Sequence, residues 1–158
     1  DLHPEFIFSF PAYNVRNTEI GGIMGLSQLK RLDENIKRRT ENLYRFLDQI
    51  NPNIYRTNFK LEGSSNYAFN LILKEPNDTL VKKLIEKMNK SGLEFRRGSA
   101  GGGNQTRQPY LKDIVPDNHY KNFPETEHVH FYGFYIGNFP DLKDEEINDI
   151  CCIINSVG

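Results

Sequence analysis

The sequence is poor in the features that hold secreted and membrane proteins together. Its only cysteines, Cys151 and Cys152, are adjacent, so they make poor disulfide partners and no metal framework. No stretch approaches the roughly 20 apolar residues that a membrane helix needs. Residues 1–10 are acidic and lack the basic start of a signal peptide. These absences predict a cytoplasmic protein that does not enter a membrane.

Charge of one sign is lacking as well. The formal net charge is −1 and no basic stripe runs along the sequence, which argues against nucleic acid as a partner. The 158 residues suit one domain, because a chain of this size buries roughly 68–70% of its unfolded surface. We therefore expect a single domain over residues 1–158.

The longest helical pattern covers residues 13–50 and predicts two consecutive helices. Asn17 or Thr18 can cap the first helix and Asp33 the second, so we expect the break near Leu32. Apolar residues recur at three-, four- and seven-residue steps and form one stripe: Leu29, Leu32, Ile36, Leu43, Phe46, Leu47 and Ile50. Three glycines in the first helix predict close approach of another backbone or of a ligand: Gly21, Gly22 and Gly25.

The rest of the chain alternates short strands with helices. We expect strands over Ile54–Asn58, Tyr67–Leu73, Leu93–Arg97 and at least part of Val129–Ile136. One helix should run from a cap at Asn77 or Asp78 to a stop at Gly92, and residues 113–128 should form a polar loop. This order predicts an α+β fold in which a helix pair leads to a small, mainly antiparallel sheet covered by helices.

A final helix is expected near the C-terminus. Asp141 should cap it, and an apolar inner face should follow: Ile147, Ile150, Cys151 and Ile154. Upstream, His128 and His130 alternate on the expected strand over Val129–Ile136, where they would point to one face. No further Cys, Asp or His lies at a spacing typical of a metal site, so an edge or interface role is the simpler interpretation.

The glycine-rich loop from Gly98 to Pro109 is the best chemical candidate. Four glycines in six residues expose backbone N–H groups that can hold an anion, and Arg107 can add a bidentate contact to phosphate or carboxylate. Asn104 and Gln105 stand where a phosphate-binding loop of nucleotide triphosphatases needs lysine and Ser/Thr. A merely flexible loop remains the alternative, and Asn104 and Arg107 favour ligand contact.

Two motifs resemble a known family. Residues 13–19, Tyr-Asn-Val-Arg-Asn-Thr-Glu, with Gly25-Leu-Ser-Gln-Leu and Leu32-Asp-Glu, resemble a block of the DegT/DnrJ/EryC1/StrS family. Residues 102–109, Gly-Gly-Asn-Gln-Thr-Arg-Gln-Pro, with Gly133-Phe-Tyr-Ile-Gly-Asn, resemble the branch that contains the hexose 3-dehydratases. Ala12 stands in place of the family's usual glycine before Tyr-Asn. The branch also includes aminotransferases, so transamination and dehydration both stay open.

The resemblance implies the C-terminal small domain of a fold type I enzyme that uses pyridoxal phosphate or pyridoxamine phosphate. Residues 1–50 would join it to a large N-terminal domain, which carries the catalytic lysine or its replacement in this family. Asn14 and Arg16 would meet the cofactor phosphate of the neighbouring subunit in a homodimer, and Asn14 precedes a helix N-terminus, which suits an anion. Gly103, Asn104 and Arg107 would meet the nucleotide-sugar. No catalytic residue and no metal ligand is assigned here.

The expected function is therefore part of a sugar aminotransferase or 4-keto-6-deoxyhexose 3-dehydratase that makes sugars for surface polysaccharide such as lipopolysaccharide. The 158 residues alone should be inactive and should not retain the cofactor, because the chemistry belongs to the cofactor and its anchoring residue. Two alternatives belong to other classes. One is a non-catalytic module that binds a phosphorylated sugar, and the other is a dimerisation domain without a ligand.

Overall fold

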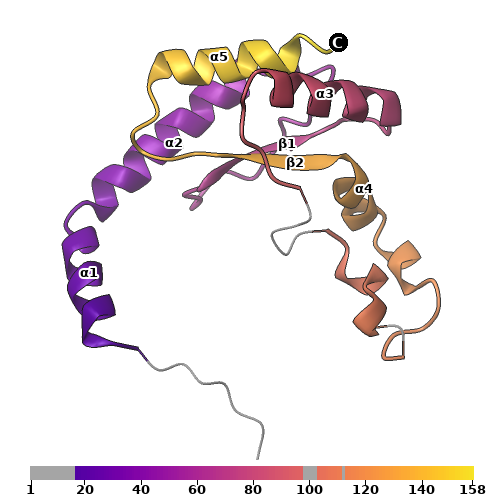
Figure 1. Cartoon of the computed structure of the whole chain (residues 1–158), viewed down its shortest axis with the longest axis horizontal. Helices are drawn as coiled ribbons and strands as arrows, with labels where there is room; N and C mark the ends of the chain where they lie inside the picture. The colour runs from indigo at the N-terminus through magenta and orange to yellow at the C-terminus, as the bar shows by residue number, and fades with distance from the viewer. Residues whose placement is uncertain (1–16, 98–102, 112) are drawn as a thin grey trace, which may run out of the picture. The chain divides into compact units, whose positions relative to one another are not determined.

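The computed structural model describes residues 17–97, 103–111 and 113–158, with the side chain of Tyr110 left out. The chain divides into two compact units, Asp1–Asp33 and Glu34–Gly158. The described part of the first unit is built around helix α1, and the second contains the sheet and the remaining helices (Figure 1). None of the described helices is long and apolar enough to cross a membrane.

Helix α1 spans Glu19–Leu29, and α2 follows at Leu32–Gln49, so the expected break is confirmed. Thr18 caps α1 by accepting a hydrogen bond from the backbone of Gly21 at 3.3 Å. Asp33 is not a cap, because α2 already begins one residue earlier. Every residue of α1 is described, and none is buried. No atom lies within 4 Å of a Cβ built on Gly22 or Gly25. Close approach of another backbone or of a ligand to these glycines therefore stays a prediction.

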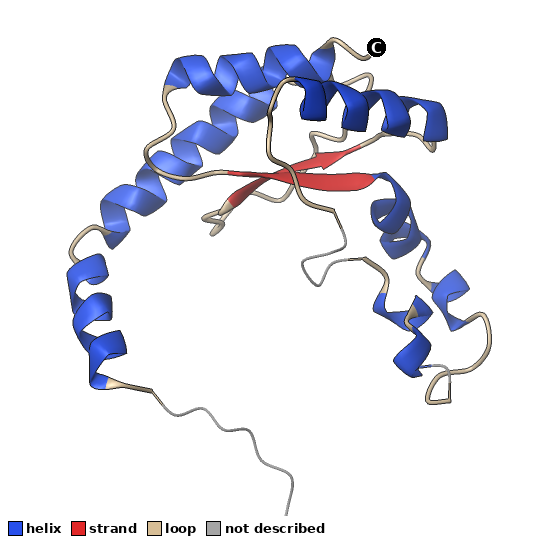
Figure 2. Cartoon of the chain, in the orientation of Figure 1, coloured by secondary structure: helices blue, strands red, loops and turns tan. Residues whose placement is uncertain are grey.

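The core of the second unit lies between the sheet and helices α2, α3 and α5 (Figures 1 and 2). Leu43, Phe46 and Ile50 carry the apolar stripe of α2 into this core. The ring of Phe46 stacks on that of Phe69 with a centroid distance of 4.4 Å. The earlier members of the predicted stripe, Leu29 and Leu32, are exposed.

The sheet consists of β1, Ala68–Ile72, and β2, Gly133–Gly137, paired antiparallel with Phe69 opposite Ile136 and Leu71 opposite Phe134 (Figure 2). These four side chains are buried, so one face of the sheet points to the core. Tyr55 pairs with Leu73, and Arg96 with Tyr135, only in isolated bridges. The strands predicted over Ile54–Asn58 and Leu93–Arg97 are therefore reduced to one paired residue each.

Helix α3 spans Asp78–Lys90 and confirms its predicted limits. Asn77 caps it by accepting from the backbone N–H of Leu80, and Gly92 follows its end with a φ of +67°. Helix α5 spans Asp144–Asn155 and buries the four predicted residues. Its cap is Lys143 rather than Asp141, because Glu146 accepts the backbone N–H of Lys143 at 2.8 Å.

The segment between Gly103 and β2 differs most from its expected polar loop and strand. Its described residues form the short 3-10 helices η2 (Gln105–Arg107), η3 (Pro109–Leu111) and η4 (His119–Asn122), and the α-helix α4, Pro124–Tyr132. The strand predicted over at least part of Val129–Ile136 is confirmed by β2, but residues 129–132 belong to α4, so His128 and His130 lie on a helix and not on a strand. Pro124 at the first helical turn has no N–H to lose there, and Glu125 and Glu127 suit its positive end.

Candidate functional site

The structure places three of the five residues that the sequence assigned to a site. Gly103, Asn104 and Arg107 lie in a turn against α4, whereas Asn14 and Arg16 lie outside the described residues, as does the loop over residues 98–102. We refer to the turn 103–107 together with its partners Glu127 and His130 as the α4 clamp. Its geometry determines what residues 103–107 can present to a ligand.

Gly103 is required by both conformation and space. Its φ is +87°, in the left-handed region. A Cβ at this position would lie 2.6 Å from Nδ1 of His130, well inside van der Waals contact. The next residue, Asn104, donates its backbone N–H to the same Nδ1 at 3.0 Å. His130 therefore holds the start of the turn, and its Nδ1 acts as an acceptor.

Asn104 is the centre of the clamp, with only 1% of its surface exposed. Its Oδ1 accepts from the backbone N–H of Thr106 at 3.0 Å and from the Thr106 hydroxyl at 2.6 Å. Its Nδ2 donates to Oε1 of Glu127 at 2.7 Å. These contacts are all intramolecular and shape η2, so ligand binding by the Asn104 side chain stays a prediction.

The Arg107 guanidinium binds Glu127 through the edge that carries Nε and Nη2, which we call its inner edge. Its Nε lies 2.6 and 2.8 Å from the two carboxylate oxygens of Glu127, and its Nη2 donates to one of them as well. The guanidinium carbon lies 3.8 Å from the ring centroid of Tyr120 and 5.2 Å from that of Phe131. Both rings supply cation–π contacts. About a third of the Arg107 side chain remains exposed.

The electrostatics of the clamp follow from this ion pair. The hydrogen bond from Arg107, with a further one from Asn104, holds the pKa of Glu127 below its ordinary value. The hydrogen bond to Glu127 in turn raises the pKa of Arg107. The carboxylate therefore stays charged at neutral pH, and the outer edge of Arg107 remains a fixed positive group that faces solvent.

The partners on α4 were missed because the segment was expected to be a strand. On a helix, Glu127 and His130 are three residues apart and share one face, from which both reach Asn104. His128 lies on another side, where its Nε2 is 2.6 Å from the carbonyl oxygen of Leu73. The sequence Pro124-Glu-Thr-Glu is a helix-start signal that could have located the pair.

The second family motif ends in another buried asparagine, Asn138, which is 1% exposed. Its Nδ2 donates to the carbonyls of Arg39 and Asn66, both at 2.9 Å, and its backbone N–H donates to Tyr67. Its Oδ1 accepts from Nδ2 of Asn42 at 3.1 Å. Asn138 therefore connects α2 to the end of the sheet, and its described contacts are structural.

The clamp offers an arginine edge backed by aromatic rings, together with the backbone of Gly103. Such a surface can hold an oxyanion through charge and can contact a sugar or base through the rings. Among the described residues, no group of three or more His, Cys, Asp or Glu is arranged to hold a metal ion. The described part of the site thus suits binding, and the cofactor residues proposed at Asn14 and Arg16 are not placed.

The chain matches a known protein family. The family model described as the DegT/DnrJ/EryC1/StrS aminotransferase family matches residues 3–155. The chain belongs to this family. The match extends through α1, α2, the sheet, the clamp and all of α5, so the α+β architecture is that of a small domain in the DegT/DnrJ/EryC1/StrS fold.

Two curated relatives resemble the chain over most of its length. GDP-4-keto-6-deoxy-D-mannose 3-dehydratase of Escherichia coli O55:H7 is 30% identical over 142 residues, which cover 89% of this chain and 36% of that protein. Lipopolysaccharide biosynthesis protein RfbH of Salmonella typhimurium is 25% identical over 154 residues, with 91% and 33% covered. The chain thus spans about a third of the length of these relatives.

A solved structure shares the fold at closely similar coverage. GDP-4-keto-6-deoxymannose-3-dehydratase with a trapped PLP-glutamate geminal diamine superimposes with a TM-score of 0.74 at 29% identity. The match covers 95% of this chain and 39% of that one. The fold prediction, a small domain from a fold type I enzyme with a small antiparallel sheet, is confirmed by these similarities.

Proposed function

We propose that this chain is the C-terminal part of a pyridoxamine- or pyridoxal-phosphate-dependent enzyme that removes the C3 hydroxyl of a nucleotide-linked 4-keto-6-deoxyhexose. The observation that carries the proposal is the 30% identity to a GDP-4-keto-6-deoxy-D-mannose 3-dehydratase across 89% of the chain. The role of RfbH in lipopolysaccharide biosynthesis supports a surface polysaccharide as the destination of the sugar. A large domain elsewhere in the enzyme would supply the catalytic residue.

In this proposal the residues of this chain bind and orient. Asn14 and Arg16 would hold the cofactor phosphate of the neighbouring subunit, and the cofactor would supply an electron sink for the sugar chemistry. Arg107 would contact a phosphate or sugar oxygen through its exposed outer edge, since Glu127 occupies its inner edge. Gly103 and Asn104 would fix the turn that aims this edge.

The enzyme is also proposed to act as a cytoplasmic homodimer. Helix α1 carries apolar side chains that are all more than 60% exposed: Ile20, Ile23, Met24, Leu26 and Leu29. A helix that is apolar on several faces is normally buried against another part of a protein. We expect the large domain or the second subunit to cover it, and light scattering of the enzyme should give a dimer.

Transamination is the second candidate, because the family is named for aminotransferases. The two reactions give different products from the same 4-keto sugar. Dehydration yields a sugar without the C3 oxygen, whereas transamination yields an amine at C4. Both would use the same binding residues in this chain, so the product decides between them.

The test uses the protein encoded by the complete gene, which we refer to as the full-length protein. It is incubated with GDP-4-keto-6-deoxymannose, cofactor and glutamate, and the product is identified by mass spectrometry and NMR. Loss of the C3 oxygen is expected. A C4 amino sugar would replace the dehydratase proposal by the aminotransferase, and an unchanged substrate would refute both for this sugar.

The 158 residues alone serve as the matched control. We expect them to show no activity and no cofactor absorbance that survives dialysis, because the anchoring lysine or its replacement is assigned to the large domain. A stable, stoichiometric cofactor band on the 158-residue chain would contradict this assignment. It would show that the chain holds the cofactor without a large domain.

A further inference from the structure

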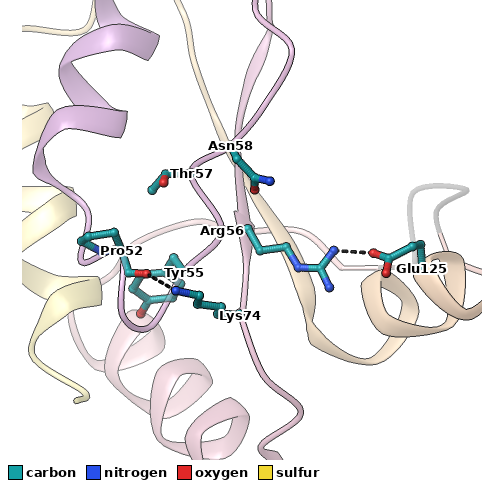
Figure 3. Close-up of a pocket in the computed structure, with 7 residues that line it drawn as sticks. All are labelled: Pro52, Tyr55, Arg56, Thr57, Asn58, Lys74 and Glu125. Carbon is teal, nitrogen blue, oxygen red and sulfur yellow. Dashed lines mark hydrogen bonds and ion pairs between the residues drawn. The ribbon is translucent and has the colours of Figure 1, made fainter.

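A polar cavity whose lining contains none of the α4 clamp residues lies beside the bridge between Tyr55 and Leu73 (Figure 3). It has a volume of about 610 Å³, which is within the usual range of small-molecule sites. The residues that line it are Pro52, Tyr55, Arg56, Thr57, Asn58, Lys74 and Glu125. Neither the family motifs nor the proposed function uses any of them.

The wall of this cavity is fixed by hydrogen bonds that do not depend on a ligand. The carbonyl of Asn51 accepts the N–H groups of Ile54 and Tyr55, and the Asn51 side chain accepts that of Asn53. The hydroxyl of Tyr55 donates to the carbonyl of Ile154 at 2.6 Å. The turn is therefore tied to α5, and a preorganised wall loses little entropy when it binds a ligand.

The bridge places two cations on the side of the backbone that faces away from the core. Tyr55 and Leu73 are buried, and side chains alternate along extended backbone. Arg56 donates its backbone N–H to Ile72, and Lys74 donates its own to Ile54. Arg56 and Lys74 thus flank the bridge diagonally, and both side chains line the cavity.

The Arg56 guanidinium is oriented by one ion pair and keeps further N–H donors for a ligand. Its Nη1 lies 2.5 Å from Oε2 of Glu125, in the first turn of α4. That bond holds the pKa of Glu125 below its ordinary value, so the carboxylate keeps the guanidinium in place at neutral pH. Arginine has five N–H donors in a planar fork. Within the described chain, this contact is the one side-chain bond that Arg56 makes, so most of its fork is available.

Lys74, Thr57 and Asn58 also have side-chain hydrogen-bonding groups that are available to a ligand. The ammonium of Lys74 has a long 3.4 Å contact with the carbonyl of Pro52, towards which it turns in Figure 3. In the described part of the chain, the side chains of Thr57 and Asn58 make no hydrogen bond, although both line the cavity. The lining therefore combines two cations and two neutral donors with one carboxylate.

We propose that this cavity binds the phosphate group of a small phosphoester, held by the fork of Arg56 and the ammonium of Lys74. Phosphate oxygens accept several charge-assisted hydrogen bonds at once, which matches a fork, an ammonium, a hydroxyl and an amide. Thr57 and Asn58 supply the neutral donors. Glu125 positions Arg56, and it can accept a hydroxyl from the rest of the ligand.

Binding is measured by isothermal titration calorimetry on the full-length protein at constant ionic strength. The probes are inorganic phosphate, glucose 1-phosphate and GDP, with glucose as the uncharged control. Phosphate-bearing probes should bind and glucose should not. Within the binding that Lys74→Gln removes, preference for glucose 1-phosphate over GDP would assign a sugar phosphate as the source, and the reverse would assign a nucleotide.

Variants separate this cavity from every other phosphate site in the enzyme. Lys74→Gln and Arg56→Gln should each weaken phosphate binding about tenfold or more, because each removes a charged hydrogen bond. Lys82→Gln on α3 is the matched control and should leave it unchanged. The inference is overturned if no phosphate probe binds at 10 mM, or if the two cavity variants bind like the unaltered protein.

A second measurement needs no variant. Acetic anhydride should acetylate Lys74 more slowly in the presence of the bound probe, while Lys82 reacts at the same rate with and without it. Mass spectrometry of peptides gives both rates. Equal acetylation of Lys74 with and without the probe would overturn the inference even if the variants failed to fold. Neither result depends on sugar dehydration, so this inference and the proposed function can fail separately.

Discussion

Helices α4 and α5 lie close in sequence but differ in how much apolar surface holds them to the rest of the protein. Helix α5 buries four side chains, and Asp144 at its start bridges Arg38 and Arg45 of α2. Helix α4, all of whose residues are described, buries none. It contributes only the half-buried Tyr132 to the core and is otherwise held by Glu125, Glu127, His128 and His130.

This difference separates stability from site construction. Apolar burial contributes roughly 25 cal/mol for each Å² and does not depend on protonation, so α5 belongs to the folding core. Charged and imidazole contacts depend on pH and salt, so α4 can respond to conditions that leave the core unchanged. The turn 103–107 and the cavity of Figure 3 each receive one carboxylate from α4, Glu127 and Glu125 respectively.

The largest expected effect is the loss of stability when a buried apolar side chain of α5 is shortened. Ile147 on α5 is fully buried, so Ile147→Ala should lower the free energy of unfolding by about 2–5 kcal/mol. Val129 on α4 is 40% exposed, and Val129→Ala should cost less than about 0.5 kcal/mol. Urea unfolding of the full-length protein measures both. Equal losses would mean that α4 is part of the core.

The next effect separates binding from structure in the full-length enzyme. Asn14→Ala should weaken cofactor retention by about 1–3 kcal/mol, the value of a hydrogen bond to a charged group. Arg107→Ala should raise KM or lower kcat/KM with cofactor affinity nearly unchanged. Cofactor titration and steady-state kinetics test the pair. Loss of cofactor in Arg107→Ala alone would show that the two roles are reversed.

Gly92 and Gly103 both have a positive φ but differ in what surrounds them, so their replacement should affect different parts of the protein. Gly92 ends α3 with no atom within 4 Å of an added Cβ, so Gly92→Ala should cost only conformational strain, about 1 kcal/mol of global stability. Gly103→Ala should instead open the clamp, because its Cβ meets His130. We expect roughly tenfold faster limited proteolysis around residues 103–111 with little change in the urea midpoint. A large shift in that midpoint would contradict a local role.

The smallest effect is the acid response of the clamp. The folded pKa of Glu127 lies below its ordinary value of 4.5, so the ion pair contributes fully above pH 4.5 and is lost as pH falls through the lowered pKa. NMR of the Tyr120 ring, which stacks on Arg107, should follow this loss. Glu127→Gln should abolish the transition, which also separates it from any change at His130. Persistence of the transition in that variant would assign it elsewhere.

The sequence predicted α5 and α3 well because an apolar face repeats with the period of a helix. All four inner residues of α5 are buried, and Asn77 caps α3 as expected. Helix α4 has no such face, so its pattern carried no burial signal. The short strands at Tyr55 and Arg96 failed for a related reason, since one bridge residue cannot establish an alternation.

The sequence predicted some residues of the candidate site but not the contacts that hold them in place. Glycines and an arginine identified Gly103 and Arg107 because their chemistry is local. Their partners Glu127 and His130 lie 20 or more residues further along, and only tertiary structure brings them together. The role of Asn104 changed most, because its burial depends on those partners. Asn14 and Arg16, outside the described residues, stay predictions.

The polar attachment of α4 also has a kinetic consequence. A helix with no buried side chain can detach from the sheet without opening the core, so its amides should exchange with solvent through a local opening. The amides of α5 can exchange only when the core itself unfolds. Deuterium should therefore label α4 in seconds to minutes and α5 orders of magnitude later, so the turn 103–107 should belong to a cooperative unit separate from α5.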